Sequence, residues 1–351
     1  MDWTSEQRAG HSGRNENKVG ENVVNIGLID VDSHNFPNLA LMKISAWHKL
    51  QGDTVEWWWG WSQYDRVYMS KVFDETYSDE IPDPVNAMEI IKGGTGYFRR
   101  RKDGYSEIFF NNGWLDNGLE SSWSIGNITF NEFLPYEIEH MCPDYSLYPK
   151  LTKNTAYGFL SRGCPRGCPF CGVAAKEGRR SYKVADLSEW WNGQKNIILC
   201  DPNILGCPEH MDLLGQLAES KAWVDMNQGV DARLLTEKNI EALNRIKIKN
   251  IHFAWDLMEQ SDLVIRGLKL YDEQGAIRDN RRRTVYVLTN YNTTMDENLY
   301  RIYTLRDDLG YDPYVMVYDK PNAPKEIKRL QRWCNSKRIF RKTPDFRDYK
   351  G

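Results

Sequence analysis

Apolar runs typical of strands flank one amphipathic stretch in the first hundred residues. The run at 23–32 (VVNIGLIDVD) is rich in β-branched and aliphatic residues without strict alternation, as in a parallel strand covered on both faces. Apolar residues then recur at helical spacing over 39–51, and Gly52 is a suitable helix end. Further strands are predicted over 54–59, 66–73 and 87–94, with a helix before the last one. This pattern predicts a small parallel α/β domain over residues 22–98.

Residues 99–152 interrupt this alternation. They are rich in glycine, asparagine and aromatic residues, which predicts a linking region with short strands. Strand and helix patterns then alternate again over residues 153–319. The predicted strands there cover 155–160, 195–200, 222–228, 250–256, 283–290 and 312–319. Six such units are about two short of a closed eightfold barrel, so we expect an open, partial barrel.

Composition narrows the class of protein. The 351 residues are 41% hydrophobic and 27% charged, which excludes wholesale disorder and allows about two domains. No long apolar run exists, so we expect no membrane partner. Residues 1–21 lack the apolar stretch of a secretory signal and are predicted to be a disordered tail. A cytoplasmic location follows as an expectation, with the seven cysteines reduced and available to metals.

The net charge of −3 conceals an uneven distribution. Residues 320–351 hold eleven Lys or Arg and three Asp or Glu, a charge of +8 that leaves −11 for the rest of the chain. A helix is predicted in this basic tail, with Trp333 and Phe340 between its cations. Two further basic runs occur at 99–102 and 281–283. Basic surfaces with aromatic side chains are typical of nucleic-acid binders, while the alternative is a cationic helix packed on an acidic body.

The sharpest chemical signal is a loop with three cysteines. Cys164, Cys168 and Cys171 have the spacing C-x3-C-x2-C and come directly after the first strand of the second domain. Three thiolates on one loop can ligate three irons of a cubane cluster, which leaves one iron open to a cofactor or substrate. The alternative is a zinc knot with a distant fourth ligand, but zinc sites favour paired C-x2-C units and no second pair occurs.

This loop resembles the signature of the radical SAM superfamily, C-x3-C-x-aromatic-C, with Phe170 at the aromatic position. The resemblance covers about residues 153–320 and implies a partial (β/α)6 barrel that follows a Rossmann-like parallel α/β domain. It implies a 4Fe-4S cluster on the three cysteines and S-adenosylmethionine on the open iron, with the adenine against Phe170. It further implies an oxygen-sensitive enzyme that receives an electron from flavodoxin or ferredoxin and forms a 5′-deoxyadenosyl radical. The substrate is not specified.

Polar residues follow the later strands of the predicted barrel, where this family binds its cofactor. The resemblance implies S-adenosylmethionine contacts from Asp201, Asn203, Gln228, Asp231, Arg233, Asp256 and Asn290. Arg233 suits a carboxylate, and Asp or Asn suits ribose hydroxyls. For each single residue, a helix cap or a loop hydrogen bond is an equal alternative.

The N-terminal domain resembles the cobalamin-binding type that precedes the barrel in one radical SAM subgroup. The matching positions are Asp32, His34, Ser70, Gly93 and Gly94. A carboxylate can orient an imidazole that ligates cobalt, so the resemblance makes cobalamin a candidate cofactor and methyl transfer the favoured reaction if it binds. The sequence departs from the pattern at Pro37, where the pattern has glycine. The alternative gives Asp32 a helix-capping role and leaves His34 as a loop residue.

Two other functions compete with this hypothesis. One is a non-catalytic nucleic-acid-binding protein that a metal on the cysteine loop stabilises. The other, a tRNA methylthiotransferase, normally has three further cluster cysteines in its N-terminal domain, and residues 1–141 contain none. The remaining cysteines, Cys142, Cys200, Cys207 and Cys334, share no metal-ligand spacing, so we expect them to be buried as small apolar groups. The alternative is that Cys200 or Cys207, which flank a turn near the expected cofactor, is redox-active or ligates a second cluster.

Overall fold

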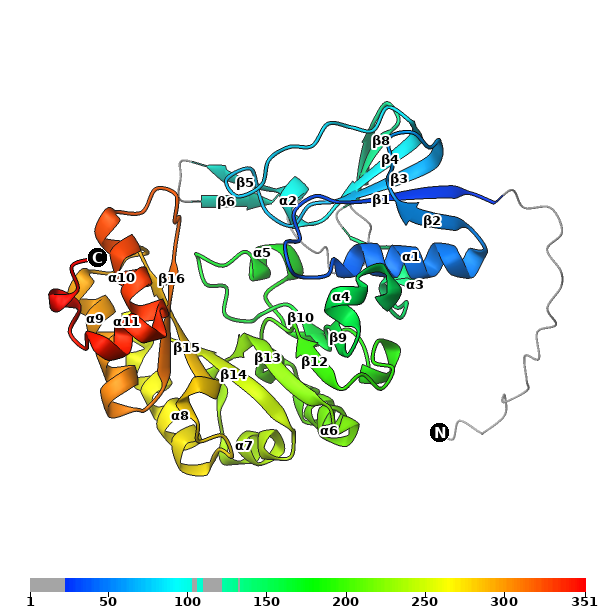
Figure 1. Cartoon of the computed structure of the whole chain (residues 1–351). Helices are drawn as coiled ribbons and strands as arrows, with labels where there is room; N and C mark the ends of the chain where they lie inside the picture. Colours follow the sequence, from blue (N-terminus) through cyan, green and yellow to red (C-terminus); the bar gives the residue numbers. More distant parts are fainter. Residues whose placement is uncertain (1–22, 103–105, 110–121, 132) are drawn as a thin grey trace, which may run out of the picture.

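The computed structural model describes residues 23–102, 106–109, 122–131 and 133–351, and it shows an α/β protein with two large sheets (Figure 1). The tail predicted over residues 1–21 lies outside the described residues. The N-terminal sheet has the order β2-β1-β3-β4-β8-β7. Its strands are β1 (Asn25–Asp30), β2 (Thr54–Trp57), β3 (Tyr64–Ser70), β4 (Ala87–Gly93), β7 (Ser122–Ile125) and β8 (Ile128–Asn131). All neighbours pair in parallel except β7 and β8, so the sheet is mixed.

Helix α1 (Leu39–Gln51) covers one face of this sheet, as its apolar spacing predicts. The Asn38 side chain accepts a hydrogen bond from the Leu41 amide at its start, and Gly52 ends it at φ +91°. Leu41 and Ile44 pack against Ile26 and other residues of the sheet. The opposite face packs against residues of α2 (Thr95–Phe98). Both faces are therefore covered, which explains why β1 lacks polar alternation.

Two details of the predicted N-terminal domain are wrong. The described residues between β3 and β4 contain no helix, because the chain there forms turns and irregular segments. The sheet also extends past residue 98, since the predicted linking region supplies β7 and β8, and the antiparallel β7 makes the sheet mixed rather than wholly parallel. A separate two-stranded ribbon, β5 (Arg99–Lys102) with β6 (Ser106–Phe109), precedes them. Helices α3 (Tyr136–Glu139) and α4 (Pro149–Thr152) then lead to the second sheet.

The second sheet contains all six predicted strands, parallel and in sequence order. They are β9 (Thr155–Gly158), β12 (Asn196–Leu199), β13 (Trp223–Val230), β14 (Ile248–Ala254), β15 (Arg283–Thr289) and β16 (Asp312–Val317). The intervening helices are α6 (His210–Ser220), α7 (Glu237–Asn244), α8 (Ser261–Gln274) and α9 (Met295–Tyr303). Among the described residues β9 and β16 are edge strands, so this sheet is not a closed barrel. Its carboxyl edge is where loops from neighbouring strands meet.

The basic C-terminal tail is part of the second core. It forms two helices, α10 (Lys325–Asn335) and α11 (Lys337–Lys342), rather than one. Trp333 is fully buried and Phe340 nearly so, with their rings 4.7 Å apart. The Asn335 side chain accepts a hydrogen bond from the Val315 amide of β16. The expectation of surface aromatic side chains on this tail is therefore wrong, because both aromatic residues face the core.

Candidate functional site

The cysteine loop lies at the carboxyl end of β9, as the sequence predicts. A short ribbon of β10 (Ser161–Arg162) with β11 (Tyr182–Lys183) brackets the loop, which ends in α5 (Val173–Glu177). The Cys171 amide donates to the Cys168 carbonyl at 3.0 Å, and the Cys164 amide donates to the Gly178 carbonyl at 3.3 Å. The first bond closes a turn between Cys168 and Cys171, and the second ties Cys164 to the residue that follows α5.

Two glycines permit the path of this loop. Gly163 has φ +74° and Gly167 has φ +57°, a region that side chains other than glycine rarely adopt. At Gly163 the space is also closed, because a Cβ atom there would overlap the Arg180 carbonyl oxygen. The entry to the cysteine loop therefore requires glycine on both grounds.

We expect Gly163→Ala to lower iron uptake and the melting temperature together, because the loop must move away from Arg180. The matched control is Gly52→Ala, which has φ +91° but nothing within 4 Å of its Cβ position. Gly52→Ala should lower the free energy of unfolding only by the backbone strain, about 1–2 kcal/mol. Thermal unfolding and iron analysis of both variants check this, and equal losses in the two would contradict it.

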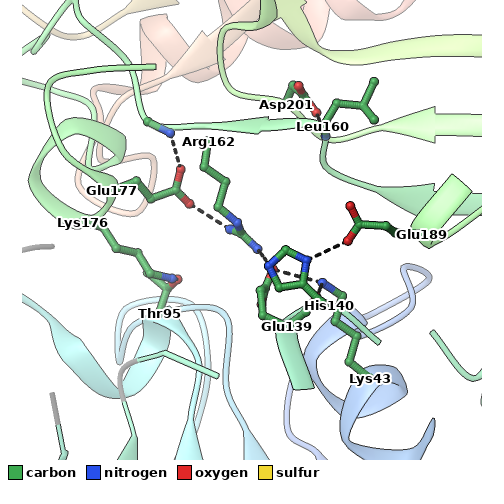
Figure 2. A network of polar contacts seen from close by, with 11 residues as sticks. Lys43, Thr95, Glu139, His140, Leu160, Arg162, Lys176, Glu177, Glu189 and Asp201 are labelled. Carbon is green, nitrogen blue, oxygen red and sulfur yellow. Dashed lines mark hydrogen bonds and ion pairs between the residues drawn. The ribbon is translucent and has the colours of Figure 1, made fainter. Parts of the chain in front are cut away.

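Asp201 anchors the start of the loop rather than facing a cofactor. Its carboxylate accepts hydrogen bonds from the Leu160 amide (2.7 Å), the Ser161 amide (2.7 Å) and the Ser161 hydroxyl (2.6 Å). The side chain is buried, and burial raises the pKa of Asp201 to about 7 against the opposing effect of these donors. The loop after β12 is therefore tied to the chain just before the cysteines (Figure 2).

We expect Asp201→Asn to destabilise the fold by about 1–3 kcal/mol. Each carboxylate oxygen faces a backbone N–H, so the new amide NH2 must face a donor in either orientation. Asp212→Asn on α6 is the control, because its side chain is 63% exposed. Chemical denaturation measures both. An Asp201→Asn protein as stable as the control would show that the anchor is not needed.

The loops after β12 and β13 bring a charged cluster to the cysteines. Asp231 accepts hydrogen bonds from Arg166 of the cysteine loop (2.7 Å) and from Arg233 (2.7 Å). Burial alone would raise the pKa of Asp231, but these two guanidinium groups outweigh it and lower the pKa. The Asn203 amide nitrogen lies 3.4 Å from Asp231 and 3.5 Å from the Cys164 sulfur. Three sequence-predicted residues thus lie beside the loop.

Asp256, at the end of β14, belongs to the same cluster. It is partly buried, and burial raises its pKa to about 6, while Arg301 and Arg233 oppose the rise and Asp231 adds to it. Arg301, which the sequence analysis missed, fixes this strand end from α9. Its guanidinium donates to the carbonyl oxygens of Trp255 (2.8 Å), Asp256 (2.9 Å) and Leu288 (2.8 Å). Arg301 thereby ties the carboxyl ends of β14 and β15 to each other.

The cysteines share electrostatic surroundings with this cluster. Burial raises the pKa of the Cys168 thiol, nearby Arg233 lowers it, and Asp256, Cys164 and Asp231 add to the rise. Burial also raises the pKa of Cys171, with Cys168 and Cys164 contributing in the same direction. Among the described residues no group of three or more His, Cys, Asp or Glu side chains is gathered as a closed metal site. The three thiols fit an iron–sulfur cluster by donor chemistry, on a loop that is not already shaped as a closed ligand set.

The other predicted cofactor contacts differ in position. Phe170 packs edge-on against Tyr291 at 5.3 Å, which in turn contacts Tyr318, so it belongs to an aromatic wall beside the loop. Asn290 adopts φ +64° and donates to the Tyr318 carbonyl. Gln228 is exposed on β13. Asn290 therefore has a local structural role, and only Phe170 of these three contributes to the walls of the site.

The residues that resemble a cobalamin site have mostly structural partners. The Asp32 carboxylate accepts from the Val72 (2.8 Å) and Phe73 (2.9 Å) amides, while His34 is exposed. The Ser70 hydroxyl accepts from the Asn38 side chain, which caps α1. A Cβ at Gly94 would overlap the Lys71 carbonyl oxygen, and one at Gly93 would lie 3.3 Å from the Asn131 oxygen. These glycines let strand loops approach each other, so these residues do not fit a corrin site in their present contacts.

A charged network that the sequence did not predict connects the cysteine loop to helix α1 of the N-terminal part (Figure 2). Arg162 bonds Glu177 (3.0 Å) and Glu139 (3.3 Å), and Lys43 of α1 bonds the same Glu139 oxygen (3.0 Å). Glu177 also accepts from the Gly163 amide at 3.0 Å. Burial acts against the charge of Arg162, but Glu139 and Glu177 raise its pKa above the usual value. The network spans residues far apart in sequence, which no local pattern reveals.

The four remaining cysteines lie outside the loop. Cys200, Cys207 and Cys334 are buried, as expected, and Cys142 is partly exposed, with its sulfur 3.1 Å from the Asn192 amide. Of the basic runs, Arg283 is buried against Asp272, Arg281 pairs with Asp279, and Arg282 bonds the Lys249 carbonyl. These arginines already have partners within the protein.

Comparison with known proteins adds no assignment, because neither a family model nor a curated protein matches this chain. In the part of the chain that the structure describes, each helix is too short or too polar to cross a bilayer.

Proposed function

We propose that this chain is a radical SAM enzyme, with a 4Fe-4S cluster on Cys164, Cys168 and Cys171. The observation that carries the proposal is the position of the C-x3-C-x2-C loop, at the carboxyl end of the first of six parallel strands in sequence order. Loops after three later strands bring Asn203, Asp231, Arg233 and Asp256 to that loop. A partial (β/α)6 barrel is the architecture that accounts for both features.

Within this proposal each residue near the three cysteines has a physical task. The iron–sulfur cluster and S-adenosylmethionine, when bound, supply reductive cleavage of a sulfur–carbon bond and start radical chemistry on a substrate. Arg233 offers a guanidinium for a carboxylate, and Asp231 holds that guanidinium in place. Asn203 can donate its amide N–H to the Cys164 sulfur. Phe170 and Tyr291 form an aromatic wall beside the thiols.

We do not extend the proposal to cobalamin or to nucleic acid. Both Asp32 carboxylate oxygens bind backbone amides, and His34 lies exposed apart from them. Trp333 and Phe340 are buried, so they cannot stack on bases.

Anaerobic reconstitution of the full chain with iron and sulfide tests the proposal. We expect about four irons per chain. We also expect addition of S-adenosylmethionine to change the electron paramagnetic resonance spectrum of the reduced cluster, because the cofactor binds the open iron. One zinc per chain, with no iron taken up, would instead favour a protein that a metal stabilises without catalysis.

A further inference from the structure

Helix α5, which follows the last cysteine of the loop, is tied to the N-terminal part of the chain. The Lys176 ammonium of α5 donates to the Thr95 hydroxyl at 2.5 Å (Figure 2). Thr95 begins α2, whose Tyr97 and Phe98 are buried in the core of the N-terminal sheet. The far end of the cysteine loop is therefore held by a residue 81 positions earlier in the chain.

Glu177, the next residue of α5, closes the cysteine loop at its base. Its carboxylate accepts a hydrogen bond at 3.0 Å from the Gly163 amide, directly before Cys164. The same carboxylate pairs with Arg162 at 3.0 Å, so two consecutive residues before the first cysteine bind it. A residue after the last cysteine thus holds the chain before the first one. The separation of the two ends of the loop therefore depends on where the Glu177 carboxylate lies.

Glu139 links this contact to helix α1. One Glu139 oxygen accepts from Arg162 at 3.3 Å and from Lys43 at 3.0 Å (Figure 2). With Glu177, the four side chains alternate in charge, two cations with two carboxylates, and they are only 12–23% exposed. Charges that are largely buried are poorly screened, and removal of one partner leaves an uncompensated charge. Loss of the Glu139 charge would leave two cations with one carboxylate, the one that closes the loop.

We propose that Glu139 is a positioning residue for the cysteine loop, and that Lys43 balances its charge. Glu139 holds Arg162, which orients the Glu177 carboxylate. That carboxylate in turn holds the Gly163 amide. The N-terminal part of the chain thereby has a task that needs no cofactor of its own, which is to set the spacing of the three thiols. The inference rests on the proposed function for the cluster, but the spacing itself is a property of the cluster-free chain.

Glu139→Gln tests this role in the cluster-free full chain. The glutamine keeps the shape of the side chain and removes its charge. We therefore expect hydrogen exchange over residues 161–178 to become at least about tenfold faster. Lys43→Gln/Glu139→Gln restores the charge balance and leaves the pair of Arg162 with Glu177. Exchange in this double variant should return to within about threefold of the unsubstituted chain.

Glu89→Gln is the matched control, because Glu89 also pairs with an arginine but lies on β4 of the N-terminal sheet. It should leave exchange over residues 161–178 unchanged. Glu139→Asp keeps the charge but draws the carboxylate back from Arg162. It serves if Glu139→Gln does not fold, and it should speed exchange about threefold. Equal exchange in the Glu139 variant and the control, or no recovery in the double variant, would overturn the positioning role.

A second readout uses the reconstituted protein. A residue that orients a metal ligand usually changes metal affinity or activity about 10–100-fold. We expect a chelator to remove iron from Glu139→Gln about tenfold faster than from the unsubstituted chain, with recovery in the double variant. Equal rates of iron loss from Glu139→Gln and Glu89→Gln would overturn the link to the cluster. If the unsubstituted chain takes up no iron, the proposed function fails, while the exchange measurement still decides the role of Glu139.

Discussion

Cys168→Ala is expected to lose both its cluster and its ability to cleave S-adenosylmethionine. Cys168 is the middle thiol of the loop; burial raises its pKa, and nearby Arg233 lowers it. Substitution of a residue that only orients a metal ligand usually lowers metal affinity or activity about 10–100-fold. Loss of a ligand itself should therefore lower the cleavage rate at least about 100-fold. Iron content after anaerobic reconstitution and the rate of cleavage measure the two effects.

Cys142→Ala is the control for this experiment. Cys142 has intermediate exposure, like Cys168, but lies in the segment before β9 and contacts Asn192. We expect that variant to keep its iron and its cleavage rate. The site assignment would fail if Cys168→Ala retained the cleavage rate, or if both variants lost iron equally. Circular dichroism of each variant separates loss of the cluster from loss of the fold.

Arg301→Met is expected to lower the free energy of unfolding by about 3–5 kcal/mol. Arg301 is completely buried, and burial lowers its pKa to about 10, so it stays charged at neutral pH. Its guanidinium donates to four backbone carbonyls, those of Trp255, Asp256, Leu288 and Glu297, and to the Asn298 side chain. Methionine keeps much of the volume but leaves these acceptors without donors. Denaturant unfolding of the cluster-free chain measures the loss.

The effect should also reach the site, because Arg301 bonds the Asp256 carbonyl. We expect reconstituted Arg301→Met to bind S-adenosylmethionine more weakly, beyond its loss of stability. Arg281→Met is the control, since Arg281 is 71% exposed and pairs only with neighbouring Asp279. That variant should unfold at nearly the same denaturant concentration as the unsubstituted chain. Similar midpoints for the two variants would contradict the role of Arg301.

The sequence predicted the second sheet well for a clear physical reason. Its strands are short apolar runs that alternate with amphipathic helices. This alternation favours a parallel sheet in which strands adjacent in sequence are also neighbours in space. Because parallel strands end at one edge, the polar residues after them had to meet there. Asn203, Asp231, Arg233 and Asp256 do meet beside the cysteines. The position of the loop after β9 followed from the same pattern.

The sequence predicted individual roles less well, because these depend on long-range partners. Asp201 was a candidate for S-adenosylmethionine, yet its acceptors serve Leu160 and Ser161, some forty positions earlier. Arg301 sits within an amphipathic helix, and no local signal marks its carbonyl partners. The charge pattern also suggested a binding surface around Trp333. Its ring instead packs in the core. The expectation was wrong because hydropathy alone does not tell which face of a basic helix is buried.

The N-terminal candidates show the same limit for a local motif. Asp32 and His34 have the spacing of a carboxylate–imidazole pair, but the amides of Val72 and Phe73, on a loop after another strand, bind the carboxylate. The resemblance at Gly94 reflects close packing against Lys71. Short motifs fix residue types, while the partners that decide their roles come from the tertiary fold.

The most direct test of the central claim is the formation of 5′-deoxyadenosine from S-adenosylmethionine by the anaerobically reconstituted, reduced protein. Chromatography with mass detection measures the product with and without reductant. We expect reductant-dependent product from the unsubstituted chain and none above background from the Cys164→Ala/Cys168→Ala/Cys171→Ala variant. Equal product from both proteins, or none from a chain that holds about four irons, would contradict the proposed function.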